Sequence, residues 1–229
     1  IFGQTNVAGD LSVKSNGPVM QNGILNVAGS TTIDAFNQSI ALSQANDFGG
    51  SVTLNGTDIS ISDRNSLTVM LSANNGYIQA GDVLSLQGKV GGSLSTVAGA
   101  TIFGQTNVAG DLSVKSNGPV MQNGILNVVG NTTIDAFNQS IALSQANEFS
   151  GPVTLNGLDI SINDRNSLML ELSSNSAIAH AGDDLSVQGK IAGNLLIVAG
   201  ATIFGQTDVI GNLSVKANGP VTQYGIINV

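Results

Sequence analysis

The chain has 229 residues, enough for one sizeable hydrophobic core, and its net charge of −8 excludes a nucleic-acid binder that relies on a basic face. Charged residues are only 10% and hydrophobic residues 41%, which excludes a disordered, highly charged chain. The absence of cysteine excludes a disulfide scaffold, and no run of about 20 apolar residues could span a membrane as a helix.

A long tandem repeat organises the sequence. The stretch that opens at Ile1 returns at Ile102 and, in a related form, at Ile203, so the period is 101 residues. We therefore expect one continuous segment, residues 1–229, with repeats 1–101 and 102–202 and a partial copy, 203–229, taken from a longer polypeptide. Such a period is typical of stacked-repeat architectures.

A finer period within each repeat predicts individual coils. A glycine followed by apolar residues two and four positions later is the template, and it recurs at Gly9, Gly29 (a weaker match), Gly50, Gly92 and Gly110. The interval from Gly50 to Gly92 is about twice as long as the others, and we interpret it as two coils. The sequence thus predicts coils of about 20 residues, five of them in each 101-residue repeat.

Short strands are expected inside each coil, because apolar residues alternate with polar ones over short runs. In chain order these strands are predicted at 11–13, 40–42, 57–62, 66–69 and 84–86. Clusters of Gly, Asn, Asp and Ser separate them and indicate tight turns. The prediction is an all-β protein, a right-handed parallel β-helix solenoid in which each strand pairs with its equivalent in the next coil, about 4.8 Å away.

The alternative architecture is a string of β-sandwich domains, each about 100 residues long. The very short strands, the absence of tryptophan and the aromatic content of 4% disfavour it, because sandwich cores depend on large aromatic residues. All seven phenylalanines follow the 101-residue period, so they are predicted to lie in the core or at corners of the coils. They are Phe2, Phe103, Phe204, Phe36, Phe137, Phe48 and Phe149.

The phrases "NGPVMQNGILNV", "ANDFGGSVTLNGTDISISD" and "VGGSLSTVAGAT" resemble the repeat tracts of filamentous-haemagglutinin-like exoproteins. These are giant bacterial surface proteins, many of which are exported by the two-partner route. The resemblance implies a long extracellular shaft that supplies length and stiffness for adhesion, biofilm formation or cell contact. Its implied location is extracellular or on the bacterial surface, and its implied partners are surface glycans or other copies of the chain.

One sequence feature favours an enzyme, the alternative function. Asp63–Arg64 and Asp164–Arg165 occupy matched places, and carbohydrate-cleaving β-helices use clusters of Asp, Arg and Lys. An active site needs several convergent groups, whereas here a single Asp–Arg pair recurs once in every repeat. We therefore predict a local ion pair at a solvated corner, and a protein that is not a polysaccharide-degrading enzyme.

The remaining candidates for chemistry are weak. His180 is the only histidine, and its counterpart in the first repeat is Gln79, so a surface substitution is expected there. Calcium could bind between stacked turns, but the calcium-binding nonapeptide and the EF-hand loop are both absent. We predict no catalytic, cofactor-binding or metal-ligating residues. The aspartates considered for calcium are Asp10, Asp34, Asp47, Asp58, Asp63 and Asp82.

The lysines also follow the repeat. With five coils in each repeat, equivalent lysines would form one column with members roughly 24 Å apart. Such a column could contact anionic glycans, although solvated lysines that discourage sideways strand pairing are the preferred interpretation. The two sets are Lys14, Lys115 and Lys216, and Lys89 and Lys190.

Overall fold

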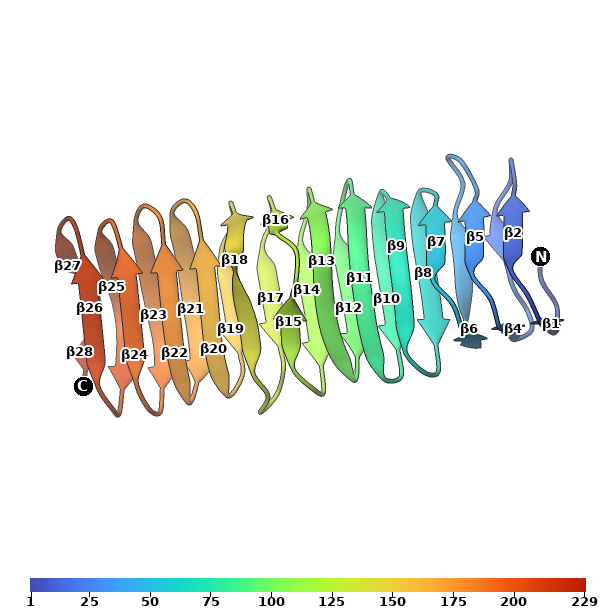
Figure 1. Cartoon of the computed structure of the whole chain (residues 1–229). Helices are drawn as coiled ribbons and strands as arrows, with labels where there is room; N and C mark the ends of the chain where they lie inside the picture. The colour runs from blue at the N-terminus through green and yellow to red at the C-terminus, as the bar shows by residue number, and fades with distance from the viewer.

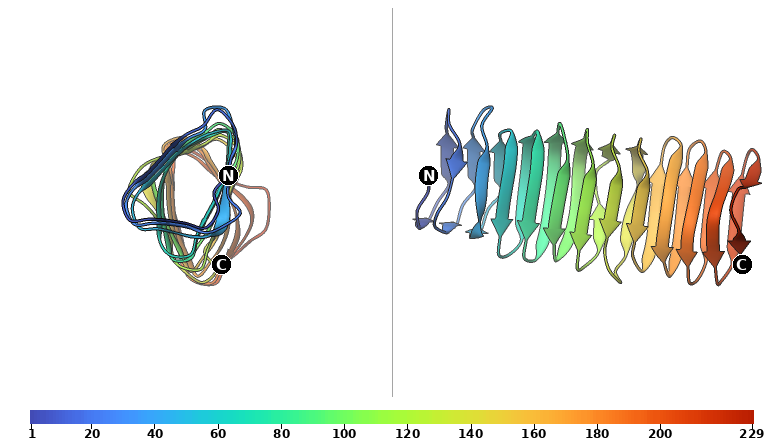
Figure 2. Two further views of the ribbon diagram at one scale, coloured as in Figure 1. Left: turned by 90° about the vertical axis from the view of Figure 1, so that its right-hand side faces the viewer. Right: turned by 180° about the vertical axis from the view of Figure 1, so that it is seen from behind.

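The computed structural model describes residues 1–229 and shows one elongated stack of β-coils, with the two termini at opposite ends (Figure 1). About 12 coils follow one another, on average roughly 18 residues apart. Seen along the axis, the coils form closed outlines around a common interior (Figure 2). The structure contains no helix that could cross a membrane.

The strands form two sheets that face each other across the core. The first sheet has 15 strands: β1 (Thr5–Val7), β3 (Val19–Met20), β4 (Leu25–Val27), β6 (Ile40–Phe48), β8 (Asp58–Asp63), β10 (Asn75–Ala80), β12 (Leu94–Ala98), β14 (Leu112–Ser116), β17 (Thr132–Asp135), β19 (Val153–Asn156), β21 (Leu168–Ser174), β23 (Leu185–Ile191), β25 (Thr202–Val209), β27 (Val221–Gln223) and β28 (Ile227–Asn228). The second sheet has 13 strands: β2 (Leu11–Lys14), β5 (Thr31–Asp34), β7 (Val52–Asn55), β9 (Leu67–Ala73), β11 (Val83–Val90), β13 (Ala100–Val108), β15 (Val120–Gln122), β16 (Leu126–Val128), β18 (Ile141–Phe149), β20 (Asp159–Asp164), β22 (Ser176–Ala181), β24 (Leu195–Ala199) and β26 (Leu213–Ala217).

Every strand pair is parallel, and the chain alternates between the two sheets, so each coil contributes one strand or one split strand to each sheet. The paired residues show that coil length varies along the axis. Thr31 pairs with Val52, and Val52 pairs in turn with Val69, so the first of these two coils is longer than the second. This parallel pairing confirms the predicted β-solenoid and excludes antiparallel sandwich domains.

The number of coils in each repeat differs from the prediction. In the first sheet β1 is followed by β4, β6, β8, β10 and β12, and the chain then crosses to β13 in the second sheet. Since β13 carries the second copy of the stretch that contains β1, one repeat spans five and a half coils instead of five. The third copy, β25, lies in the first sheet again. Successive repeats therefore present the same residues on opposite sides of the stack.

The interval between Gly50 and Gly92 explains why the predicted number of coils in each repeat is wrong. Gly50 precedes β7 in the second sheet, but Gly92 precedes β12 in the first, so the interval covers two and a half coils. Coils in this part of the repeat are shorter than predicted, as the pairing of Leu67 with Leu84 shows. Glycine marks corners at both edges of the stack, and the sequence pattern does not distinguish one edge from the other.

The core lies between the inner faces of the two sheets and contains 52 buried hydrophobic residues. Because alternate residues of a strand point to opposite faces, the inward positions of successive coils stack into ladders. Phe103 and Phe204 are fully buried, whereas Phe36 and Phe137 are exposed at corners, as predicted for core or corner residues. One inward ladder of the first sheet contains Leu42, Ile61, Ile78, Thr96, Val114, Ile134, Leu155 and Leu172.

Candidate functional site

Each complete repeat contains a polar bulge, one of two places where the strand pairing shifts register. In the first repeat β6 pairs with β8, but the register shifts between Leu42 and Asn46, so β6 carries extra residues that its partner lacks. Residues 43–45 are exposed, while Asn46 turns back into the interior and is fully buried. Such bulges leave backbone groups without ladder partners, and these groups need other hydrogen bonds.

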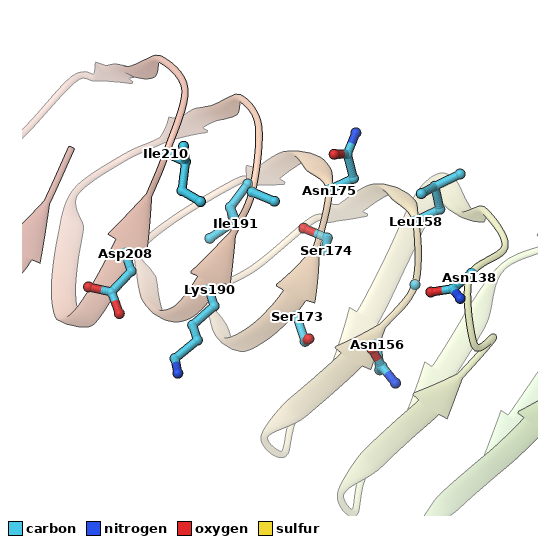
Figure 3. Close-up of a pocket in the computed structure, with 12 residues that line it drawn as sticks. Asn138, Asn156, Leu158, Ser173, Ser174, Asn175, Lys190, Ile191, Asp208 and Ile210 are labelled. Carbon is cyan, nitrogen blue, oxygen red and sulfur yellow. The ribbon is translucent and has the colours of Figure 1, made fainter.

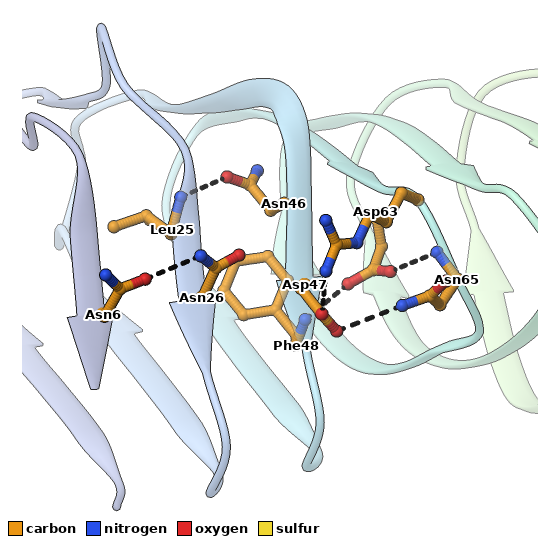
Figure 4. A network of polar contacts seen from close by, with 9 residues as sticks. Asn6, Leu25, Asn26, Asn46, Asp47, Phe48, Asp63 and Asn65 are labelled. Atoms are coloured by element: carbon orange, nitrogen blue, oxygen red, sulfur yellow. Dashed lines mark hydrogen bonds and ion pairs between the residues drawn. The ribbon is translucent and has the colours of Figure 1, made fainter. Parts of the chain in front are cut away.

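The side chain of Asn46 supplies those hydrogen bonds, and Figure 4 shows the one from Leu25. Its Oδ1 accepts from the backbone N–H of Leu25 at 2.9 Å, and its Nδ2 donates to the carbonyl oxygens of Leu42 at 2.9 Å and Ser62 at 3.0 Å. The amide of Gln21 pairs with it in both directions, at 2.8 and 2.9 Å. One buried amide thus connects three successive coils. Asn147 makes the equivalent bonds in the second repeat.

Asp63 lies beside this bulge and points inward. Its carboxylate accepts hydrogen bonds from the backbone N–H groups of Phe48 and Asn65, both at 2.7 Å. Burial raises the pKa of this carboxyl above its ordinary value of 3.8, because desolvation disfavours the charged form more than these two donors favour it. The carboxyl of Asp164 has a raised pKa for the same reason.

The raised pKa values predict a pH-dependent stability. A carboxyl whose pKa is higher in the folded chain stabilises the fold fully below pH 3.8, and this contribution is lost as the pH rises through the folded pKa. In urea denaturation followed by circular dichroism, the Asp63→Asn/Asp164→Asn variant should show less decline of the midpoint between about pH 4 and pH 7 than the parent chain. Equal declines in both proteins would contradict the assignment.

Arg64 does not pair with its neighbour Asp63. Its guanidinium forms an ion pair with Asp47, one coil away, and Arg165 pairs with Glu148 in the same way. The prediction of a local ion pair at a solvated corner is therefore correct for the arginines, but the aspartate partner is wrong. The reason is strand alternation, which turns Asp63 toward the core and leaves Arg64 on the surface. Asp63 holds the backbone and is not open to a substrate.

The lysines predicted to form one column lie on two faces. Lys14 on β2 and Lys216 on β26 belong to the second sheet, and Lys115 on β14 belongs to the first. Lys89 and Lys190 are divided in the same way. The single column is wrong because a repeat of five and a half coils moves each copy to the opposite sheet.

The other residues singled out in the sequence make local contacts. His180 is exposed, and its Nδ1 lies 2.7 Å from Oδ1 of Asn163. Asp10 accepts from the backbone N–H of Ser30 at 2.7 Å, while Asp82 is exposed at a corner. The structure shows no group of three or more His, Cys, Asp or Glu side chains arranged to hold a metal ion.

An open groove of about 560 Å³ follows one edge of the second repeat, where the chain passes from the first sheet to the second (Figure 3). Its lining comes from the corners of five successive coils, after β17, β19, β21, β23 and β25. The parallel pairing of these strands aligns their corners, and the sequence spacing of the stacked residues varies from 21 to 17 to 18, so a uniform coil length could not find them. The lining residues are Asn138, Asn156, Gly157, Leu158, Ser173, Ser174, Asn175, Lys190, Ile191, Ala192, Asp208 and Ile210.

Comparison with known proteins gives one result. A family model described as repeats of unknown function (DUF5649) matches residues 1–55, 91–156 and 192–229. The three matched segments are successive copies of one part of the 101-residue repeat, and together they cover more than half of the chain. Neither a curated protein nor a solved structure gives a significant match.

Proposed function

We propose that this chain, which belongs to the family of repeats of unknown function (DUF5649), is the stiff shaft of a bacterial surface or extracellular filament protein. The observation that carries the proposal is the unbroken parallel pairing from the first coil to the last. About 12 coils at about 4.8 Å each make a rod of roughly 55 Å. In this role the repeats supply length and stiffness for adhesion, biofilm formation or contact between cells.

The arrangement of side chains supports a structural role. The carboxylates and amides that are buried, Asp63 and Asn46 with their copies, hold backbone groups of the bulge in place. The same network recurs on the opposite sheet in the next repeat, whereas an active site needs convergent groups in one cleft. We therefore propose that the chain has a structural role without catalytic activity, and that it is not a polysaccharide-degrading enzyme.

Two finer features belong to the same proposal. The first is right-handed winding, which rests on the strong bias of parallel β-crossovers toward that hand. The second is placement outside the cell or on its surface, which rests on the resemblance to filamentous-haemagglutinin-like repeat tracts. The low content of charged residues and the absence of cysteine are compatible with this placement.

Small-angle X-ray scattering tests the shaft directly. A version with one additional copy of residues 102–202 should be longer by about 26 Å, the height of five and a half coils, at an unchanged cross-section. A compact particle, or an added repeat that widens the particle without lengthening it, would refute the shaft. Protease shaving of intact bacteria tests the placement, since a surface shaft must be removed while cytoplasmic proteins remain.

A further inference from the structure

The loops that carry Phe36 and Phe137 combine backbone strain with an exposed aromatic ring. The two residues have φ values of +53° and +51°, and they are 51% and 54% exposed. A bulky side chain in this left-handed region is an outlier that glycine or asparagine would avoid at lower cost. Residues 31–46 and 132–147 are nevertheless identical in sequence. A strained backbone at a bulky side chain that stays about half exposed is typical of a functional position.

Hydrogen bonds hold each loop in one conformation. The backbone N–H of Phe137 donates to Oδ1 of Asp135 at 2.9 Å, and Asn156 donates to the same oxygen at 2.9 Å. The backbone N–H of Gln139 donates to the carbonyl of Ala136 at 3.0 Å. The ring is therefore presented to solvent from a preorganised loop, which lowers the entropic cost of binding.

The loop of Phe137 adjoins the groove in the second repeat. Asn138, the next residue, lines the groove, and the coils that follow add the other lining residues (Figure 3). Amides and hydroxyls that both donate and accept hydrogen bonds lie beside apolar side chains along the axis. The polar residues of this lining include Asn138, Asn156, Ser173 and Asn175, and the apolar ones include Leu158 and Ile210.

The charge on the groove favours a neutral occupant. Lys190 and Asp208 are register partners on adjacent coils of its flank, so one positive and one negative charge lie side by side. The corners repeat at about 4.8 Å along the axis, which suits a linear polymer with a regular unit. Hydroxyl-rich rings with an apolar face match both the amide groups and the exposed phenylalanine. A second copy of the chain is a poorer match, because two chains of charge −8 repel each other.

We propose that the loop 136–140 and the adjoining groove bind a neutral polysaccharide chain that lies along the axis, with one sugar ring stacked on Phe137. This deepens the proposed shaft function by naming its partner class and the residues that contact it. The matching loop with Phe36 lies at the opposite edge, where the chain passes from the second sheet to the first. There Thr57 and Ala109 replace Leu158 and Ile210, so the first-repeat site has less apolar surface and binds more weakly.

Isothermal titration calorimetry of the whole chain with cellohexaose and chitohexaose tests the proposal, with a heparin hexasaccharide as the acidic comparison. Phe137→Ala should weaken binding of a neutral hexasaccharide by about tenfold or more, as expected for a central aromatic anchor. The double change Leu158→Thr/Ile210→Ala, which introduces the residues of the first repeat, should also weaken it. Phe36→Ala is the matched control and should change the affinity less than about threefold.

The results that would contradict the polysaccharide site can be told apart from those that would contradict the shaft. No binding of either neutral hexasaccharide, binding of heparin alone, or an affinity that Phe137→Ala leaves unchanged would overturn the polysaccharide site. Sedimentation that shows self-association abolished by Phe137→Ala would assign the surface to a second copy of the chain instead. Scattering of the same variants separates the two proposals, since the rod dimensions do not depend on Phe137.

Discussion

Replacing Asn46 by alanine is expected to lower the free energy of unfolding by about 3 kcal/mol or more. The change leaves the backbone N–H of Leu25 and the carbonyls of Leu42 and Ser62 without their buried partners. Each unsatisfied buried group costs about 1–3 kcal/mol, and no water is expected to replace an amide that bridges three coils. Urea denaturation followed by circular dichroism measures the effect.

Two variants make this prediction specific. Asn147→Ala removes the equivalent amide on the opposite sheet and should cost a similar free energy. Arg64→Ala removes an exposed ion pair in the same network and should cost no more than about 1 kcal/mol. If Asn46→Ala and Arg64→Ala destabilise the chain equally, the buried amide does not have the role assigned to it.

Replacing Gly88 by alanine should also destabilise the chain strongly, with an expected loss of about 3 kcal/mol. Gly88 has a φ of +148°, and a Cβ atom added to it would lie 2.0 Å from the carbonyl oxygen of Leu71 on the adjacent strand. The residue lies where the pairing of β11 with β13 shifts register, so the backbone cannot move without breaking the ladder. The same denaturation experiment measures this loss.

Gly17 provides the matched control. Nothing lies within 4 Å of a Cβ atom added there, so Gly17→Ala should leave the unfolding free energy within about 0.5 kcal/mol of the parent chain. Gly189 repeats the geometry of Gly88, with a φ of +136° and the carbonyl of Leu172 at 2.0 Å, and should respond like it. A tolerated Gly88→Ala variant would mean that the register of this bulge is not a requirement of the fold.

The half-coil offset between successive repeats places the same exposed residues on alternating sides of the stack. Because each 101-residue repeat spans five and a half coils, every exposed feature appears on opposite sides in turn, about 26 Å further along the axis. Phe36 and Phe137 show this alternation, as do Lys14 and Lys115. A partner that recognises one loop would therefore meet it on both edges of the shaft, and an even number of repeats would present equal numbers on each.

The candidate site was only partly accessible to sequence reasoning. Asp63 and Arg64 were identified as a pair, and the alternation of "ISISDR" could have shown that Asp63 points inward. Asn46 was missed because "SQAN" resembles a polar surface stretch, and nothing local indicates that its last residue is buried. The groove was missed because Asn138, Leu158 and Ile210 belong to different coils, and only the stacking of coils places them along one edge.

Local sequence patterns are sufficient to predict the parallel solenoid, the alternation of inward and outward residues, and the repetition of nearly every feature from one long repeat to the next. These properties depend on local chemistry: short alternating runs make strands, and clusters of Gly, Asn and Ser end them. The unequal coil lengths and the half-coil offset between repeats become visible only in the folded chain. The reason is that coil length depends on which residues stack, and stacking is a contact between distant parts of the chain.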